Sequence, residues 1–242
     1  MKYAIFSDIH GNYEAFISVL EKAEEQEVDS LVFLGDIVGY GASPCECLAL
    51  LKRNSDISLG GNHDYAIAGK TSTRYFNEYA KAAVLWTQGQ LADADRKYLG
   101  SLPVMGKNDD MTYAHSSPFE PEHWHYVTNA LDAKRNFEYF SGEICFLGHS
   151  HVPLILEKQA DGTLAGIRDK KVCLKEGHRY IVNDGSVGQP RDGNPKASFC
   201  IFDTEERSIE IVRVDYDIET EQKKIVKSGL PRFLSERLSV GR

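Results

Sequence analysis

The chain has 242 residues, of which 42% are hydrophobic, and a formal net charge of −8 with no block rich in lysine or arginine. This composition is typical of globular proteins and excludes disordered, collagen-like and coiled-coil chains, while the acidic balance argues against nucleic-acid binding. No apolar run is long enough to cross a bilayer, and a strand-like run begins at residue 3 without a signal peptide, so we expect a cytoplasmic protein with no membrane contact.

The five cysteines are an odd number with irregular spacing, and they match neither a redox pair nor a zinc knuckle. We therefore expect five reduced thiols. Two of them, Cys145 and Cys200, lie in apolar runs and are expected in the core.

The first third of the chain alternates short apolar runs with amphipathic segments. Asn12 is placed to cap the first helix. The expected strands cover residues 3–6, 31–34 and 57–59, and the expected helices cover about 13–20 and 44–51.

The middle of the chain predicts one helix over about 75–99, with Phe76, Tyr79, Ala83 and Trp86 on its apolar face. Short runs separated by Gly- and Asp-rich turns follow, and the chain is expected to end in one or two helices. The expected later strands are 111–114, 144–147, 152–156, 180–182, 197–202 and 209–214. An α/β half followed by a β-rich half predicts a single domain, 1–242, in which two sheets pack face to face with helices outside.

Five motifs rich in metal-ligand residue types occur along the chain, each after an expected strand. In order, they are Asp8-Ile9-His10, Gly35-Asp36-Ile37-Val38-Gly39, Gly61-Asn62-His63-Asp64, a lone His115, and Gly148-His149-Ser150-His151. Because open α/β folds place their sites at the carboxyl ends of strands, these side chains should meet at one edge. Alternation along a strand would direct Asp8 and His10 the same way, and His149 and His151 likewise.

The ligand types are carboxylates, imidazoles and one carboxamide, with no thiolate. That set favours two divalent cations of intermediate hardness, such as manganese, iron or zinc, over a structural zinc site. Asp36 lies in a Gly-flanked turn and is the candidate bridge, because each carboxylate oxygen can serve one cation. His63 next to Asp64 suggests a protonated imidazole held by a carboxylate, which donates to the leaving oxygen.

This ordered set of motifs resembles the calcineurin-like metallophosphoesterase superfamily, and most closely its small bacterial and archaeal phosphodiesterase-type branch. The resemblance implies an αββα sandwich and a dinuclear site, with His63 as the catalytic imidazole. It places Asp8, His10, Asp36 and His151 on one cation, and Asp36, Asn62, His115 and His149 on the other.

Two positions depart from the family pattern. Asp184 replaces the proline of the usual Asn-Pro-Gly-Ser segment, and Ser116 replaces the glycine that usually follows His115. Neither change removes a ligand, but both alter loops that are expected to face the substrate.

Several polar residues have two readings on sequence alone. Asn12 caps a helix or contacts a phosphate, and Arg191 forms an ion pair or holds a phosphate with its planar fork. His123 and His125 belong to a solvated loop or meet the substrate.

The expected function is therefore hydrolysis of phosphodiesters or small nucleotide-type phosphomonoesters, by attack of a metal-bridging hydroxide on phosphorus. A protein phosphatase or a dinucleoside polyphosphate hydrolase is the alternative within the enzyme class, because the fold does not decide the substrate. Outside the enzyme class, the alternative is a non-catalytic scaffold that resembles the retromer subunit. A cover over the site by residues 116–126 would favour a nucleotide substrate. The sequence does not predict the oligomeric state.

Overall fold

The computed structural model describes residues 1–108 and 110–242, in which two six-stranded mixed sheets face each other. In the first sheet the strand order is β3-β2-β1-β11-β12-β9, with β1, β2 and β3 parallel. The bounds in that order are Ile57–Ser58, Ser30–Phe33, Lys2–Phe6, Ala197–Asp203, Ser208–Val214 and Lys171–Cys173.

The second sheet has the order β4-β5-β6-β10-β7-β8, with β5, β6 and β10 parallel. The bounds in that order are Met105–Asn108, Met111–Ala114, Ile144–Leu147, Arg179–Asn183, Leu154–Lys158 and Leu164–Ile167. Aromatic residues from both sheets, including Tyr3, Tyr113 and Phe146, form a shared buried cluster, so the main core lies between the sheets.

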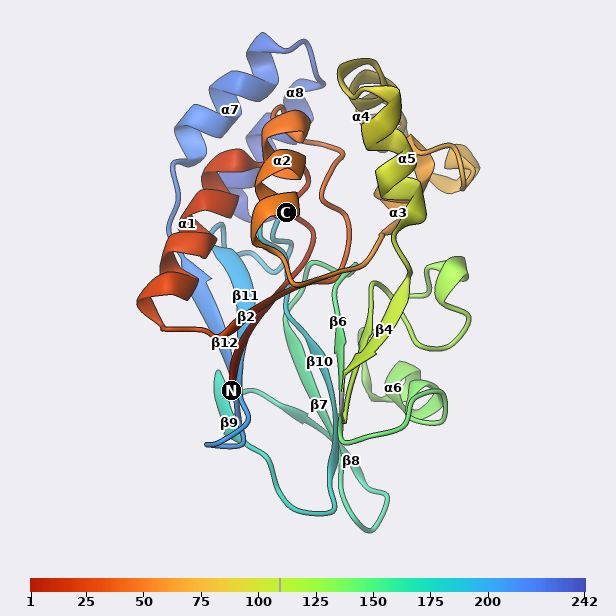
Figure 1. Cartoon of the computed structure of the whole chain (residues 1–242), viewed down its shortest axis with the longest axis vertical. Coiled ribbons are helices and arrows are strands. Elements are labelled where there is room, and N and C mark those ends of the chain that lie inside the picture. The colour runs from red at the N-terminus through yellow and green to blue at the C-terminus, as the bar shows by residue number, and fades with distance from the viewer. Residues whose placement is uncertain (109) are drawn as a thin grey trace.

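Helices cover the outer faces of both sheets (Figure 1). The α-helices α1 to α8 are Tyr13–Glu25, Pro44–Asn54, Asn62–Ile67, Glu78–Gln90, Asp93–Ser101, Ala130–Asn136, Ile218–Lys227 and Arg232–Glu236, and the 3-10 turns are Thr73–Tyr75, Pro121–His123 and Arg237–Val240. Apolar side chains of α1 and α2 pack on the first sheet, and α6 packs on the second. The predicted αββα architecture is thus confirmed.

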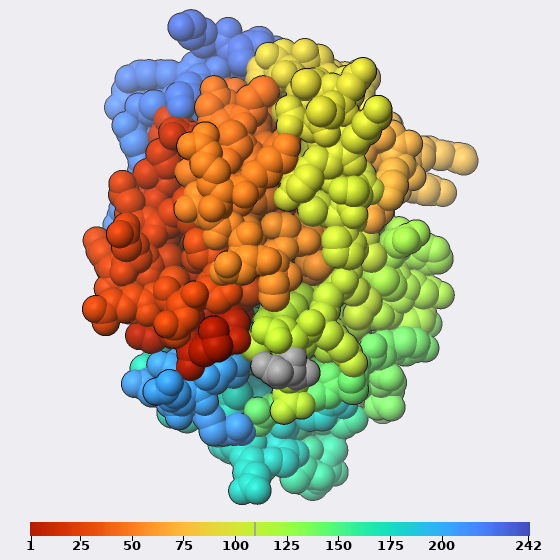
Figure 2. Space-filling model, in the orientation of Figure 1, coloured from red at the N-terminus to blue at the C-terminus, as the bar shows by residue number. Residues whose placement is uncertain are grey.

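On the face shown in Figure 2, α1 and α2 (red to orange) adjoin α4 and α5 (yellow).

Among the described residues the longest helices have 13 residues, and none combines the length and apolar character that a bilayer crossing requires.

The prediction of one helix over residues 75–99 is wrong in one respect, because the structure has two helices there, α4 and α5. The backbone of Leu91 and Ala92 is extended, and the Leu91 side chain is buried in the core. Gly89, one turn earlier, weakens the helix by about 1 kcal/mol relative to alanine. The free energy gained by burying Leu91 therefore outweighs the free energy of continuing the helix.

Candidate functional site

The structure brings together all seven residues that the sequence suggested as metal ligands. Six of them lie in the loops after strands β1, β2, β5 and β6, and Asn62, after β3, is the first residue of α3, so all seven lie at the carboxyl ends of the parallel strands. All of them are buried, and they are Asp8, His10, Asp36, Asn62, His115, His149 and His151.

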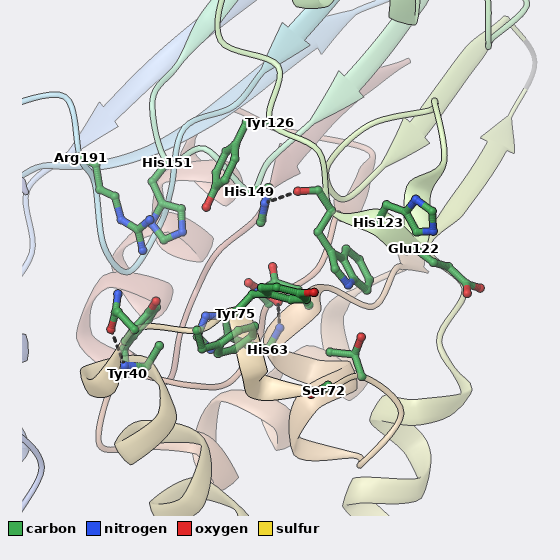
Figure 3. A pocket seen from close by; sticks show the side chains of 17 residues that line it. Tyr40, His63, Ser72, Tyr75, Glu122, His123, Tyr126, His149, His151 and Arg191 are labelled. Carbon is green, nitrogen blue, oxygen red and sulfur yellow. Dashed lines mark hydrogen bonds between the residues drawn. The ribbon is translucent and has the colours of Figure 1, made fainter.

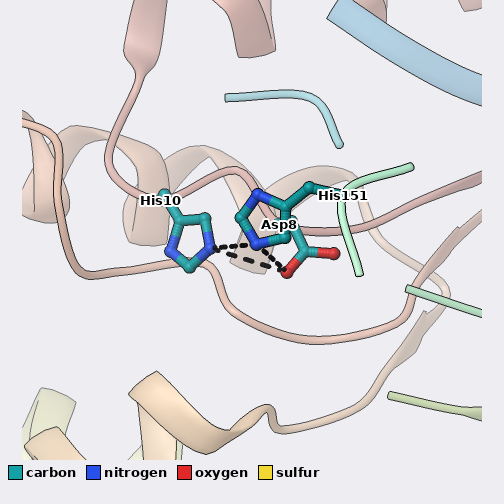
Figure 4. Close-up of side chains that lie close together, drawn as sticks. All are labelled: Asp8, His10 and His151. Atoms are coloured by element: carbon teal, nitrogen blue, oxygen red, sulfur yellow. Dashed lines mark hydrogen bonds and ion pairs between the residues drawn. The ribbon is translucent and has the colours of Figure 1, made fainter. Parts of the chain in front are cut away.

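Asp8, His10 and His151 form one group of potential ligands (Figure 4). The two Nε2 atoms of the histidines lie 3.2 Å apart. Asp8 Oδ1 lies 3.2 Å from Nε2 of His151 and 3.5 Å from Nε2 of His10. Three donor atoms therefore converge on one point.

Asp36, His115 and His149 form the second group, and Asn62 joins it. Nε2 of His115 lies 3.2 Å from Asn62 Oδ1 and 3.5 Å from Asp36 Oδ2. The same Asp36 oxygen lies 3.7 Å from Nε2 of His10 in the first group. One carboxylate oxygen thus faces both groups, whereas Asp36 Oδ1 accepts a hydrogen bond from the backbone N–H of His63.

The hydrogen bonds of the imidazoles show that these donor sets fit cations. Each of four imidazoles has one ring nitrogen that faces a backbone carbonyl. This nitrogen is Nδ1 in His10 (3.1 Å), His115 (3.1 Å) and His151 (2.7 Å), and Nε2 in His149 (3.0 Å). A carbonyl only accepts, so each of these nitrogens carries the hydrogen, and when the ring is neutral the other nitrogen presents its lone pair to the site.

Lone pairs that face each other and a carboxylate in a buried space repel unless a positive charge lies between them. Asp8 Oδ1 is also buried without a hydrogen-bond partner among the described residues. Divalent cations held by imidazole and carboxylate ligands satisfy both features.

The backbone at the site is strained. Five of the seven residues have positive φ between 50° and 64°, namely Asp8, His10, Asp36, His149 and His151. This left-handed region costs a non-glycine residue about 1 kcal/mol or more. The sequence argument from strand alternation was wrong, because β1 ends at Phe6 and β6 at Leu147, and these turns direct the side chains instead.

Gly61 permits the close approach of two site loops. A Cβ atom at this position would lie 2.1 Å from Asp36 Oδ1. Any side chain here would displace the carboxylate that faces both groups.

The charges of the buried groups are coupled. Burial alone raises the pKa of Asp8 and of Asp36, but the imidazoles of His151 and His115 outweigh it and hold both pKa values well below the usual range. Burial alone lowers the pKa of His115, but the Asp36 carboxylate outweighs it and raises this pKa to about 9. Burial lowers the pKa of His149 to about 3.

These shifts predict that cation binding displaces a proton from His115. With a pKa of about 9, its imidazole is protonated at pH 7, and ligation requires the neutral ring. We expect Mn²⁺ affinity to rise about tenfold per pH unit between pH 7 and 8, as one proton released per binding event requires. Isothermal titration at pH 7 and pH 8 measures the Mn²⁺ affinity, and equal affinities at the two pH values would contradict the raised pKa of His115.

A hydroxyl behind the site links Asp8 to Asp184, one of the departures from the family pattern. Ser7 Oγ lies 2.6 Å from Asp8 Oδ2 and 2.8 Å from Asp184 Oδ1. Burial raises the pKa of Asp184 well above its usual range, so this carboxyl is neutral. A hydroxyl has one hydrogen, and with a neutral Asp184 on its other side Ser7 donates it to Asp8.

Ser7→Ala is therefore expected to weaken metal binding by about 10- to 100-fold, the usual effect of losing a hydrogen bond that orients a ligand. Ser18→Ala removes a helix hydroxyl that bonds only the backbone carbonyl of Glu14 and is the matched control. Metal affinity of both variants is measured by titration. Equal affinities would show that Ser7 does not orient Asp8.

Asp64 has a different place from the one we expected, which was beside the His63 ring. Its carboxylate accepts from the backbone N–H groups of Asp36 at 2.7 Å and Gly61 at 3.0 Å. Burial raises its pKa to about 8. Asp64 thus ties the loop of Asp36 to the loop of Asn62.

The ring of His63 is packed among Tyr40, His10 and Phe76, with ring centroids 4.5 to 4.9 Å away. Its Nδ1 is buried without a hydrogen-bond partner in the described part of the chain. Burial lowers the pKa of His63 well below its usual value, so the ring is neutral here rather than protonated as expected. An anionic group beside it, in addition to the Asp36 carboxylate, would favour protonation.

A cavity of about 530 Å³ opens above both groups (Figure 3). Asp36, Asn62, His63, His149 and His151 line it. Its aromatic walls come from two segments, with Tyr75 and Phe76 on one side and Trp124 and Tyr126 on the other.

The second wall belongs to the segment that was expected to cover the site. Tyr126 stacks on His149 with ring centroids 4.2 Å apart, and the carbonyl of Trp124 accepts from Nε2 of the same residue. By contrast Ser116, at the start of this segment, is buried. Phe76 was expected only in a helix face, and its role as a pocket wall was missed because no local pattern marks it.

Of the two residues that were predicted to contact the substrate, Arg191 lines the cavity and Asn12 does not. Arg191 lines the cavity, and its guanidinium donates to Gln189 Oε1 at 2.7 Å; no carboxylate among the described residues pairs with it. Asn12 is buried, caps α1 through Ala15 N–H and donates to the Gly188 carbonyl. Both polar atoms of Asn12 are thus engaged, and it does not line the cavity.

Comparisons with known proteins agree with this geometry. The family model described as the calcineurin-like phosphoesterase superfamily domain matches residues 1–207. The Methanocaldococcus jannaschii protein MJ0912, whose name states no activity, is 43% identical over 244 residues, covering 99% of this chain and 98% of its own.

Two solved structures cover the whole chain. A metallophosphoesterase from Sphaerobacter thermophilus is 40% identical with a TM-score of 0.88, over 100% of this chain and 99% of its own. The protein PH1004 from Pyrococcus horikoshii is 22% identical with a TM-score of 0.80, over 100% and 98%, and it shows the shared fold.

Proposed function

The chain belongs to the calcineurin-like phosphoesterase superfamily, and from this premise we propose that it hydrolyses phosphodiesters or small nucleotide-type phosphomonoesters at a centre of two divalent cations. The general activity, hydrolysis of phosphoric esters by a metal-dependent enzyme, follows from the family. The number of cations, their identity as manganese, iron or zinc, and the substrate are our proposal.

The convergence of imidazole lone pairs on two adjacent points carries the proposal. His10 and His151 present theirs to one point beside Asp8, and His115, once it has released its proton, presents its own beside Asn62. Asp36 Oδ2 lies between the two points. Two cations bound there supply Lewis acidity to the phosphoryl oxygens and lower the pKa of a water molecule.

The other polar groups of the cavity suit the transferred phosphate. Arg191 presents a planar charged fork that donates to a neutral amide and lies over the Tyr40 ring, with no carboxylate paired to it among the described residues. The Asp36 carboxylate beside His63 raises its pKa, but burial outweighs this and keeps the ring neutral; a bound phosphate would add further negative charge. Protonated in this way, it donates to the leaving oxygen.

The shape of the cavity favours a small substrate over a phosphoprotein. Its volume of about 530 Å³ lies within the range of small-molecule pockets, and aromatic walls suit a nucleobase or another flat ring. A protein phosphatase would need a shallow groove. A dinucleoside polyphosphate hydrolase remains the alternative within the same class of small substrates.

The test compares hydrolysis of bis-p-nitrophenyl phosphate and p-nitrophenyl phosphate by the Mn²⁺-loaded chain. Faster turnover of the first supports a diesterase, and faster turnover of the second supports a monoesterase. No turnover of either, with two Mn²⁺ bound, would support the scaffold alternative. A screen of phosphorylated metabolites with His63→Ala as the blank then identifies the substrate.

Arg191→Ala is expected to raise KM for the better substrate about 10- to 100-fold, because a hydrogen bond to a charged group contributes about 1.5 to 3 kcal/mol. Arg191→Lys keeps the charge without the fork and should recover part of this loss. Steady-state kinetics measure both. An unchanged KM in both variants would remove Arg191 from the substrate site.

A further inference from the structure

A second cluster of metal-ligand residue types lies at the mouth of the cavity, outside the centre described above. Glu120 precedes the 3-10 turn Pro121–His123, His123 is its last residue and His125 follows it, and all three are exposed. Nε2 of His125 lies 3.0 Å from Glu120 Oε2, and Nδ1 of His123 lies 3.2 Å from the same oxygen. One carboxylate oxygen and two imidazole nitrogens thus meet, all within 4.8 Å of one another.

These separations match those within a tetrahedral zinc site. Two ligand atoms bound to one Zn²⁺ at about 2.0 Å each are about 3.3 Å apart. The distances from Glu120 Oε2 to the two histidines differ from this value by 0.3 Å or less. A cation can therefore enter with small side-chain adjustments.

The His125 ring and the backbone at both ends of the turn are ordered by contacts outside the cluster. The His125 ring stacks on Phe119 with ring centroids 5.4 Å apart, and the guanidinium of Arg135 covers Phe119 at 3.6 Å. Glu120 and Trp124, at the two ends of the turn, have positive φ of 46° and 58°. Non-glycine residues adopt this region only where the surroundings impose it, and such residues concentrate at functional sites.

We propose that Glu120, His123 and His125 bind a third divalent cation at the rim of the cavity. Two imidazoles and one carboxylate select zinc, cobalt or nickel over magnesium or calcium, which prefer oxygen ligands. Three protein ligands leave a position for water or for an anionic group of the substrate. In Figure 3, His123 lies at the end of the cavity opposite Arg191, so this cation and Arg191 would flank a bound substrate.

A cation at this site would also act on the main centre. Its ligands His123 and His125 flank Trp124, whose carbonyl accepts from Nε2 of His149 at 3.0 Å. Tyr126, one residue further, stacks on the His149 ring. Fixing the turn therefore fixes the orientation of His149 and the wall of the cavity.

The test is the number of Zn²⁺ ions bound by the metal-stripped full-length chain, measured by isothermal titration and by metal analysis after desalting. Glu120→Gln and His125→Ala should each bind one equivalent fewer than the unsubstituted chain. Glu122→Gln removes a carboxylate of the same exposed turn without removing a ligand, and it should bind the full number.

Because the readout is a difference in stoichiometry, it does not depend on how many ions the main centre holds or on turnover. The same stoichiometry in Glu120→Gln, His125→Ala and the unsubstituted chain would overturn the proposal. Loss of one equivalent in Glu122→Gln as well would also overturn it, since the effect would then follow the charge of the turn. The two ligand variants change exposed side chains, and circular dichroism establishes that they fold.

Discussion

Asp36→Asn is expected to abolish phosphoesterase activity and to empty both positions of the metal centre at micromolar Mn²⁺. Asp36 Oδ2 faces both ligand groups, 3.5 Å from Nε2 of His115 and 3.7 Å from Nε2 of His10. The amide that replaces it carries no charge. Because metal ions contribute several kcal/mol to such reactions, the loss should be on the order of 10³-fold or more.

The measurement combines metal content after desalting with turnover of the better aryl phosphate. Asp161→Asn, in the exposed turn between β7 and β8, removes one carboxylate far from the cavity and is the matched control. Two bound ions with full activity in Asp36→Asn would refute the bridging role.

His63→Ala is expected to lower kcat by about 10² to 10⁴-fold, the usual contribution of a general acid, while two Mn²⁺ ions remain bound. The imidazole lines the cavity, and its Nδ1 has no hydrogen-bond partner among the described residues. If His63 acts only when substrate is present, its removal should lower kcat more than it lowers the occupancy of the metal sites.

Metal analysis decides between this role and another one. His63 also lies within ligand distance of His10 and Asp36, so it belongs to a third possible donor group. If His63→Ala loses metal in proportion to activity, the residue is a ligand and the catalytic assignment fails. His178→Ala, which removes an imidazole that pairs with Glu157 outside the cavity, should retain both metal and activity.

The architecture follows from local patterns that are visible in the sequence. Apolar runs such as residues 31–34 and 144–147 each end two positions before Asp36 and His149, and residues 31–33 and 144–147 lie in strands in the structure. Side chains at the carboxyl ends of parallel strands share one edge of a sheet, whatever the rest of the chain does. For that reason the five motifs could be named, and their meeting place predicted, from residue types and spacing, whereas the family resemblance implied which seven residues in them are ligands.

The way in which the side chains are directed could not be predicted. Strand alternation was the argument for Asp8 and His10, but both residues lie beyond the strand in left-handed conformations. Such conformations are unfavourable for each residue alone, so no local propensity predicts them. Only the surrounding loops, such as the one that Asp64 holds through backbone hydrogen bonds, can impose them.

The sequence by itself determined which residues are candidate ligands, their order after the strands and the sandwich of two sheets, because each depends on residues close together in the chain. The tertiary structure alone decided the aromatic walls, the link from Asp184 through Ser7 to Asp8, and the placement of Asp64 on the backbone. Ser7 and Asp184 are 177 positions apart. Contacts over such separations arise only when the two sheets pack, and packing free energy has no signature in a short stretch of sequence.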